Sequence, residues 1–152
     1  MREGDAEARW AGRNPAKDAL RDAIWSEINL PDIVAEVEAV FARYEQALVG
    51  NDVATLGELF WASERTIRYG IAENLYGQAE IAAFRAARPS HGLMRRLERT
   101  VITTFGRDMA TASTLFRRDS QPGMVGRQMQ TWMRTQAGWK VVAAHVSLVR
   151  EA

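Results

Sequence analysis

Cysteine is absent from this chain of 152 residues, and histidine occurs only twice, at His91 and His145. Without a thiol the chain can form no disulfide, no thiolate metal site and no cysteine nucleophile. Two histidines are too few for a histidine-rich metal site, so we expect no metal. The common short motifs are missing as well: there is no glycine-rich phosphate loop, no GxSxG elbow and no HExxH.

Long apolar runs and an excess of one charge are also lacking. No run approaches the ~20 residues of a membrane span, and the first residues lack the apolar core of a signal peptide. The formal net charge is only +1. We therefore expect a cytoplasmic protein whose main partner is neither nucleic acid nor membrane. With 47% hydrophobic residues, the chain can bury a real core as a single domain.

Apolar residues recur at helical spacing between Pro31 and Gly50, which predicts a long helix. The stripe consists of Ile33, Val37, Val40, Phe41, Tyr44, Ala47 and Leu48. Tyr44 differs from its neighbours because its ring ends in a hydroxyl. That hydroxyl must either make a structural hydrogen bond in the core or point into a polar cavity.

The remaining patterns predict an α+β fold. Shorter helices are expected at 15–28, 52–61 and 81–88, a strand pair at 66–70 and 73–78, and four long strands from Leu93 onward. Short connections between the long strands favour an antiparallel meander, and their length implies a curved sheet that wraps the helices. Residues 1–14 are small, charged and aperiodic, so we expect them to be loosely held.

One predicted strand carries an unusual alternation. Gln128, Gln130 and Trp132 alternate with Met129 and Met133, so the two sets face opposite sides. Either the amides and the indole line a small polar pocket, or the methionines mark the core and the glutamines face solvent. The spacing alone favours neither interpretation.

Four further side chains are ambiguous by the same reasoning. An inward Arg68, in TIRYG, would require an anionic ligand or a buried carboxylate, whereas on an edge strand it would lie in water. Arg117 and Arg118 end a strand, so one points to each face. His145 either satisfies a structural hydrogen bond or serves a site as a base.

A resemblance to a known family is carried by whole segments in order: INLPDIVAEVEAVFARYEQALVGNDVATLGELFW, TIRYG, ENLYG, AAFRAAR, RTVITTFGRDMATASTLFRR, GRQMQTW and GWKVVAAHVSL. Together they strongly resemble the AtzH-like branch of the SnoaL-like, nuclear-transport-factor-two-like superfamily. The resemblance covers about residues 27–149. We therefore expect an N-terminal extension over residues 1–26 and a single domain over 27–152.

The resemblance implies a cone-shaped α+β roll. Its long N-terminal helix and shorter helices pack in the concave face of a curved mixed, mainly antiparallel sheet, and such domains commonly form homodimers. A tyrosine and an arginine that are essential in one family member match Tyr44 and Arg68, and ketosteroid isomerase relatives also have a tyrosine at the position of Tyr44. Ligand contacts in other relatives map to the strand GRQMQTW. The substrate-binding candidates are Gln128, Gln130, Trp132, Arg117 and His145.

Members of this branch are encoded beside amidases of oxalurate catabolism, and one is a decarboxylating amidohydrolase. The resemblance thus implies a cofactor-free hydrolase of an N-carboxylated urea such as 1,3-dicarboxyurea, in which Arg68 binds carboxylate and Tyr44 acts as donor or acid. The alternative is a non-catalytic protein that binds a small anionic ureido or carbamate ligand, or an accessory partner of an amidase. An isomerase or dehydratase ranks last, because an arginine cannot replace the base that such enzymes use.

Overall fold

The computed structural model describes residues 14–152. Its helices are α2 (Pro15–Ser26), α3 (Pro31–Val49), α4 (Val53–Leu59) and α5 (Gln78–Ala87), and its strands are β1 (Ile67–Tyr69), β2 (Asn74–Tyr76), β3 (Arg96–Phe105), β4 (Met109–Arg117), β5 (Met124–Thr135) and β6 (Gly138–Arg150). Each element lies where its sequence pattern predicted it, although α5 begins at Gln78 rather than at Ile81. The expectation for residues 1–14 falls, except at Asn14, outside the described residues.

The strands form one six-stranded sheet in the order β2-β1-β6-β5-β4-β3. Strands β3 to β6 are a meander of antiparallel neighbours, whereas β1 runs parallel to β6 and antiparallel to β2. The register shifts between Glu98 and Val101 and between Thr131 and Trp132, and such bulges increase the local twist. The mixed, mainly antiparallel sheet confirms the predicted α+β class.

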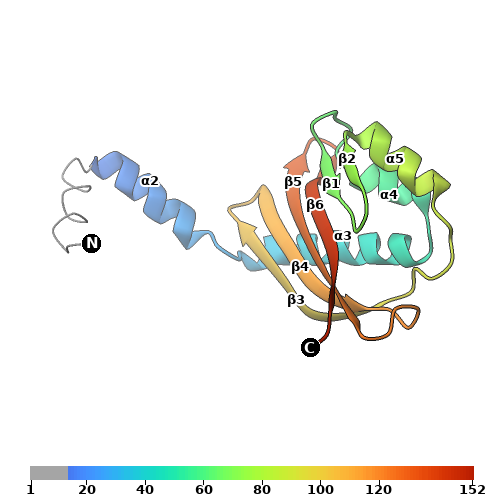
Figure 1. Ribbon diagram of the computed structural model, residues 1–152. Coiled ribbons are helices and arrows are strands. Elements are labelled where there is room, and N and C mark those ends of the chain that lie inside the picture. The colour runs from blue at the N-terminus through green and yellow to red at the C-terminus, as the bar shows by residue number, and fades with distance from the viewer. Residues whose placement is uncertain (1–13) are drawn as a thin grey trace, which may run out of the picture.

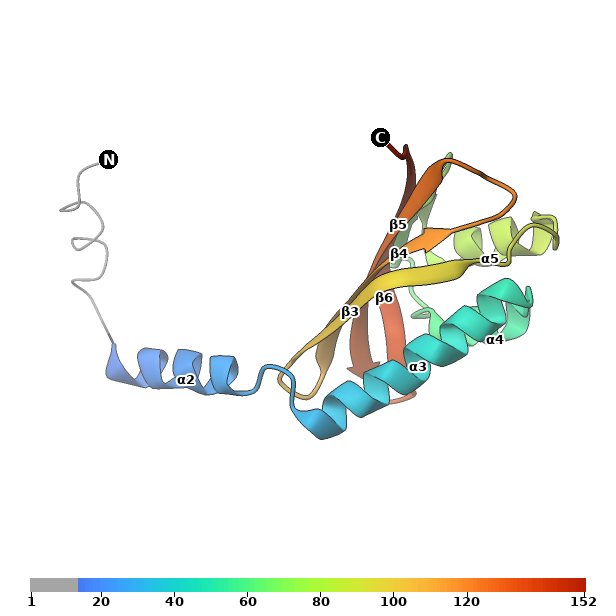
Figure 2. The ribbon, with the colours of Figure 1, turned by 90° about the horizontal axis from the view of Figure 1, so that it is seen from below.

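Helix α3 lies along the inner face of the curved sheet, as Figure 2 shows from below. Its predicted stripe is buried at Ile33, Val37, Phe41, Tyr44, Ala47 and Leu48. These side chains share one core cluster with residues of α4, β4, β5 and β6. Each large aliphatic side chain contributes about 1.5–3 kcal/mol when it is fully buried, so the stripe anchors α3 along its whole length.

The end of α3 is set by an asparagine. Asn51 has a φ of 50°, in the left-handed region, whereas Gly50 has a φ of −85°. Asparagine tolerates this region better than most residues, so Asn51 makes the left-handed turn that follows α3. Asp52 then caps α4, because its Oδ1 accepts a hydrogen bond from the backbone N–H of Thr55 at 3.1 Å. The long helix and the next short one are therefore held at a fixed angle.

Helix α2 projects away from the sheet and the other helices (Figure 1). Asn14 caps its first turn by accepting a hydrogen bond from the Ala16 N–H at 3.0 Å. Leu20 and Trp25 are 63% and 65% exposed, so neither of these two apolar side chains of α2 packs on its own domain. Asn29 joins the helix to β3 through reciprocal hydrogen bonds with the backbone of Thr104.

No helix within residues 14–152 is both long and apolar enough to cross a membrane.

Candidate functional site

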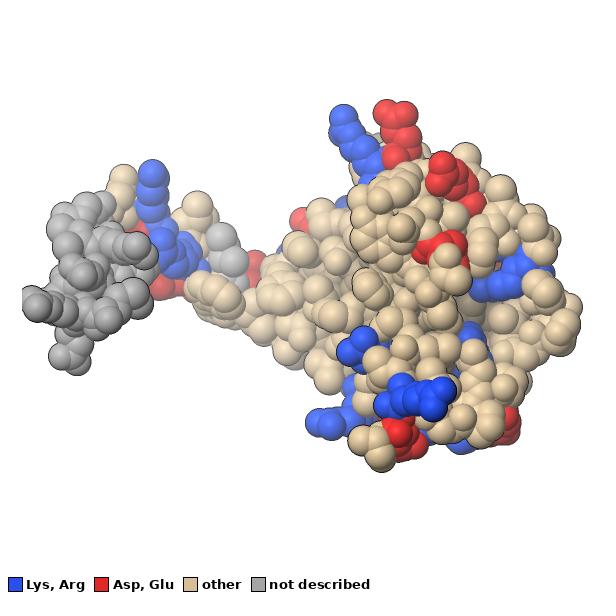
Figure 3. All heavy atoms as spheres, viewed as in Figure 1, with Lys and Arg blue, Asp and Glu red and all other residues tan. Residues whose placement is uncertain are grey.

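A cavity of about 150 Å³ lies where α3 and α5 face the β1, β5 and β6 side of the sheet. Its lining combines one tyrosine, four arginines, one glutamate, two glutamines and one histidine with apolar side chains. In Figure 3, basic side chains in blue lie in and beside a recess on the right of the domain. The polar lining residues are Tyr44, Arg68, Glu73, Arg88, Arg95, Arg118, Gln128, Gln130 and His145.

Tyr44 reaches this cavity from the buried stripe of α3. Its residue is only 3% exposed. The ring lies 6.4 Å from the Trp132 ring in an edge-on arrangement and 6.3 Å from the Phe60 ring. Aromatic neighbours on two sides fix the ring, so its hydroxyl can be aimed at the cavity without loss of packing.

Arg68 approaches the cavity from the middle of β1 and is 8% exposed. Strand β1 lies inside the sheet, between β2 and β6, so Arg68 is not an edge residue in water. Its Nη1 donates to Glu73 Oε1 at 2.8 Å, and its guanidinium lies 5.6 Å from the centre of the Phe84 ring. A methyl group at Gly70 would collide with the Glu73 carboxylate, so this glycine is what allows the carboxylate to lie beside Arg68.

The alternation on β5 places the amides and the indole inside. Gln128, Gln130 and Trp132 are 5%, 2% and 0% exposed, whereas Met129 is 59% exposed. The Trp132 Nε1–H donates to Gln130 Oε1 at 3.1 Å, and Arg95 Nη2 donates to Gln128 Oε1 at 2.9 Å. Both amides are therefore oriented through their oxygens. Their Nε2 groups have no hydrogen-bond partner among residues 14–152.

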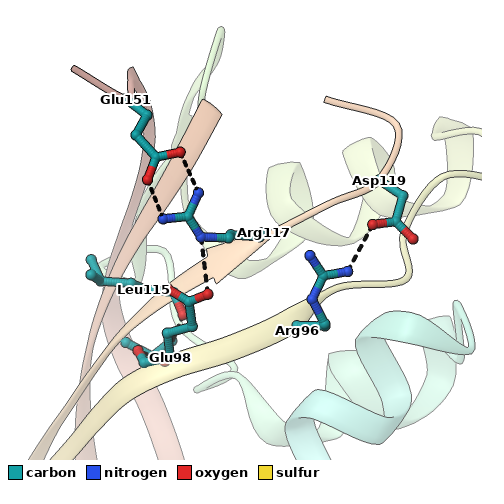
Figure 4. A network of polar contacts seen from close by, with 7 residues as sticks. Arg96, Glu98, Leu115, Arg117, Asp119 and Glu151 are labelled. Carbon is teal, nitrogen blue, oxygen red and sulfur yellow. Dashed lines mark hydrogen bonds and ion pairs between the residues drawn. The ribbon is translucent and has the colours of Figure 1, made fainter. Parts of the chain in front are cut away.

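Arg117 lies away from the cavity. Its Nε donates to Glu98 Oε1 at 2.9 Å, and its two terminal nitrogens each donate to Glu151 at 2.7 Å (Figure 4). Successive residues of a strand point to opposite faces, so Arg118 enters the cavity lining instead. The expectation that Arg117 contacts a ligand thus lacks geometric support, and Arg118 takes that place.

His145 and Trp132 stand at the margins of the site. His145 borders the cavity, but it pairs in register with the exposed Met129, and its ring packs edge-on at 6.2 Å from the exposed Tyr69. The imidazole therefore belongs to the outer face of the sheet. Trp132 is fully buried behind Tyr44 and acts on the cavity through Tyr44 and Gln130, without lining it.

Sequence reasoning missed several charged residues of the site. Arg95, just before β3, donates through Nε and Nη2 to both carboxylate oxygens of Glu45 on α3. On α5, Arg85 and Arg88 follow the buried Ile81 at helical spacing, which was a usable signal that they share its inward face. Arg85 is 1% exposed, and none of its three side-chain nitrogens has a hydrogen-bond partner among the described residues.

Burial and the crowding of like charges lower the pKa of Arg85, Arg88 and Arg118. Burial lowers the pKa of Arg85 to about 10, and the neighbouring Tyr44 opposes this shift. Burial also lowers the pKa of Arg88 and of Arg118, and the positive charges around them, including Arg95, act in the same direction. A region in which cations destabilise one another gains stability from a bound anion.

The unpaired polar atoms of the lining point to the same ligand class. They are the Nε of Arg88 and Arg118 and the Nε2 of Gln128 and Gln130, all of which are donors. Within residues 14–152 no cluster of histidine, aspartate and glutamate could hold a metal ion. The arrangement can therefore bind a small anion and offer it the hydroxyl of Tyr44.

Comparisons with known proteins agree with this fold. The model of the AtzH-like family matches residues 26–152. A protein of unknown function from the DUF3225 family of Pectobacterium atrosepticum is 60% identical, with 82% of this chain and 96% of that chain covered and a TM-score of 0.80. A cystatin-like fold protein from Burkholderia xenovorans is 52% identical, with 83% and 98% covered and a TM-score of 0.80.

A more distant solved structure has the same architecture. A proposed dehydratase of the NTF2-like family from Streptomyces avermitilis is 19% identical, with 78% of this chain and 96% of that chain covered and a TM-score of 0.63. At this identity the likeness concerns the fold alone. A comparison with curated proteins finds no match. The family and the fold fit a small-molecule-binding or enzymatic role.

Proposed function

The chain belongs to the AtzH-like family, and from that premise we propose that it is a cofactor-free hydrolase that removes carbon dioxide from an N-carboxylated urea such as 1,3-dicarboxyurea. The observation that carries the proposal is the convergence of Tyr44, Arg68 and unpaired amide donors on one buried cavity. A cavity whose unpaired groups are all donors favours an anion, and a volume of about 150 Å³ favours a compact one.

Substrate binding begins at Arg68. Glu73 accepts a hydrogen bond from Nη1 of this guanidinium, which orients it and leaves the edge formed by Nε and Nη2 for a carboxylate of the substrate. The Nε2 of Gln130 supplies a further donor from the neighbouring wall. Together these groups hold one carboxylate of the substrate out of conjugation with its carbamate nitrogen.

The chemical step breaks the bond between that nitrogen and the carboxylate carbon. Carbon dioxide leaves, the electron pair of the bond stays on nitrogen, and nitrogen takes a proton from the hydroxyl of Tyr44. Water then returns a proton to the tyrosine oxygen. The Arg85 guanidinium carbon lies 6.0 Å from the centre of the Tyr44 ring, and its charge favours the negative oxygen that forms during the transfer.

A non-catalytic role is the second candidate, and one observation favours it. Neither Glu73, which is paired with Arg68, nor the outward His145 ring is available in the cavity as a base, and the described residues place no other carboxylate or imidazole in its lining. The same cavity could therefore bind a ureido acid for an amidase without changing it. Copurification with an amidase, together with no turnover by this chain alone, would support that role.

The proposal is tested by following release of carbon dioxide from a ¹³C-carboxylated urea by NMR, with and without the protein. Tyr44→Phe should lower the rate by a factor on the order of 10² to 10³, because it removes the donor and keeps the ring. Tyr69→Phe is the matched control, since Tyr69 lies on the outer face beside Tyr76. Equal turnover by Tyr44→Phe and the parent would refute the assigned acid.

A further inference from the structure

The cavity holds more positive charge than one carboxylate requires. Two of its four arginines are already paired, Arg68 with Glu73 and Arg95 with Glu45. Arg88 and Arg118 have no carboxylate partner among residues 14–152, and both line the cavity. Two uncompensated cations in a half-buried place are costly unless an anion joins them.

Arg88 and Arg118 reach the cavity from different elements. Arg88 follows α5, and its Nη2 donates a long hydrogen bond of 3.5 Å to the Asn51 Oδ1. Arg118 follows β4, and its guanidinium lies 5.0 Å from the centre of the Phe116 ring. In both residues the Nε has no hydrogen-bond partner among the described residues. Each guanidinium therefore keeps donors available for a ligand.

Phe116 and Gly126 build a platform for this part of the cavity. The Phe116 ring carries Arg118 and also Arg95, whose guanidinium lies 4.5 Å from the ring centre. The ring lies against Gly126 so closely that an added Cβ would come within 2.1 Å of it. Arg95 in turn donates to the side-chain oxygen of Gln128, and the Gln128 Nε2 stays unpaired. The guanidinium of Arg118 and the amide of Gln128 thus offer two kinds of hydrogen-bond donor to the same part of the cavity.

We infer that Arg88, Arg118 and the Gln128 amide form a second anion subsite, which holds the second carboxylate of the proposed dianionic ligand while Arg68 holds the first. The inference rests on the proposed function, because it assigns the second end of the same ligand. Charge balance supports it: Glu73 and Glu45 compensate two of the four lining arginines, and the ligand compensates the other two. The cavity volume of about 150 Å³ suits a short dicarboxylate.

The test measures binding alone. Isothermal titration calorimetry compares malonate and succinate with their monoamides, malonamate and succinamate, which keep the length and lose one charge. The parent should bind one of the dicarboxylates about 10-fold or more tightly than its monoamide, the gain expected from a second charge-assisted contact. Equal affinities, or no saturable binding of either dicarboxylate, would overturn the inference.

Variants locate the second subsite. Arg88→Gln and Arg118→Gln should each remove most of the preference for the dicarboxylate and leave monoamide affinity unchanged, whereas Arg68→Gln should weaken both ligands. Arg118→Lys, which keeps the charge, should restore part of the preference and separates loss of charge from loss of folding. Arg96→Gln is the control, because Arg96 pairs with Asp119 on the exposed side of the sheet. An undiminished preference in both Gln variants would overturn the assignment.

The binding test and the turnover test fail separately. A protein that prefers dicarboxylates but releases no carbon dioxide would keep this subsite and lose the proposed reaction. A protein that releases carbon dioxide with no preference for a second charge would lose the subsite and keep the reaction.

Discussion

Arginines on the outside of this protein and arginines around its cavity differ in how completely they are paired with carboxylates. On the outside, Arg117 contacts both Glu98 and Glu151, and Arg107 contacts Asp32. Around the cavity, Arg118 has no carboxylate partner among the described residues although it is the next residue along the chain, and the fully buried Arg85 has no hydrogen-bond partner there.

This difference runs against the solvation energies. Water screens an exposed guanidinium and makes its pairing nearly optional, whereas a buried one needs a partner. The protein pairs the exposed Arg107 and, inside the cavity, Arg68 and Arg95 with carboxylates, and it leaves Arg88 and Arg118 in the same cavity without a carboxylate partner among residues 14–152. Interior cations without a carboxylate partner cost folding free energy, even where an aromatic ring such as Phe60 lies against them as it does at Arg85, so their retention indicates a ligand or a reaction that uses them.

The largest expected effect separates the two regions by activity. Arg68→Gln should lower kcat/KM, which corresponds to an activation free energy higher by on the order of 2 to 5 kcal/mol, because the substitution truncates one partner of a buried charge contact. Arg117→Gln should leave kcat/KM at the parent value, since its contacts with Glu98 and Glu151 lie outside the cavity. Both are measured in the ¹³C assay. A comparable loss of kcat/KM in both variants would show that the cavity arginines and the outer arginines do not differ in function.

The next effect concerns stability at the buried cation. Arg85→Met should raise the free energy of unfolding by about 1 to 4 kcal/mol, because an apolar side chain beside Phe60 replaces a charge without hydrogen bonds. The same variant should lose activity. Arg43→Met, at an exposed ion pair with Glu58, should leave stability unchanged within error. Urea unfolding measures both, and a less stable Arg85→Met protein would mean that Arg85 is satisfied in the fold.

The smallest effect tests the platform below the cavity. Gly126→Ala should cost about 1 to 3 kcal/mol of unfolding free energy, because the new methyl group must displace the Phe116 ring and the two arginines on it. Gly57→Ala is the matched change inside α4, where the nearest atom would lie 3.8 Å away. It should stabilise by about 0.4 to 1 kcal/mol. Calorimetric unfolding distinguishes the two variants. A Gly126→Ala protein as stable as the parent would show that the position of the Phe116 ring does not depend on Gly126.

Local patterns predicted the fold well because each element follows its own periodicity. The apolar stripe of α3 specified both the helix and the inward direction of Tyr44. Turn residues between the long stretches specified the meander from β3 to β6. The alternation of side chains along β5 was equally informative, because it predicted that Gln128, Gln130 and Trp132 share one face of the strand. Only the choice of which face turned inward needed the resemblance to a family.

The cavity was predicted less completely, because its polar contacts join residues far apart in the chain. Arg95 meets Glu45 and Gln128 across separations of 50 and 33 residues, which no local period encodes. Arg117 and Arg118 are equivalent in the sequence, and the end of β4 could present either one to the helices. Strand alternation predicted only that one of these two arginines would point inward. In the structure it is Arg118, which lies over the Phe116 ring that packs against Gly126.

The sequence by itself determined that a long helix would bring a tyrosine hydroxyl to the inner face of a curved antiparallel sheet, because hydrophobic periodicity acts within one element at a time. Only the tertiary structure decided which charges surround that hydroxyl and which of them stay unpaired. Pairing depends on distances between elements that meet only after folding, and those distances place Glu73 and Glu45 on two arginines and leave Arg88 and Arg118 to the cavity.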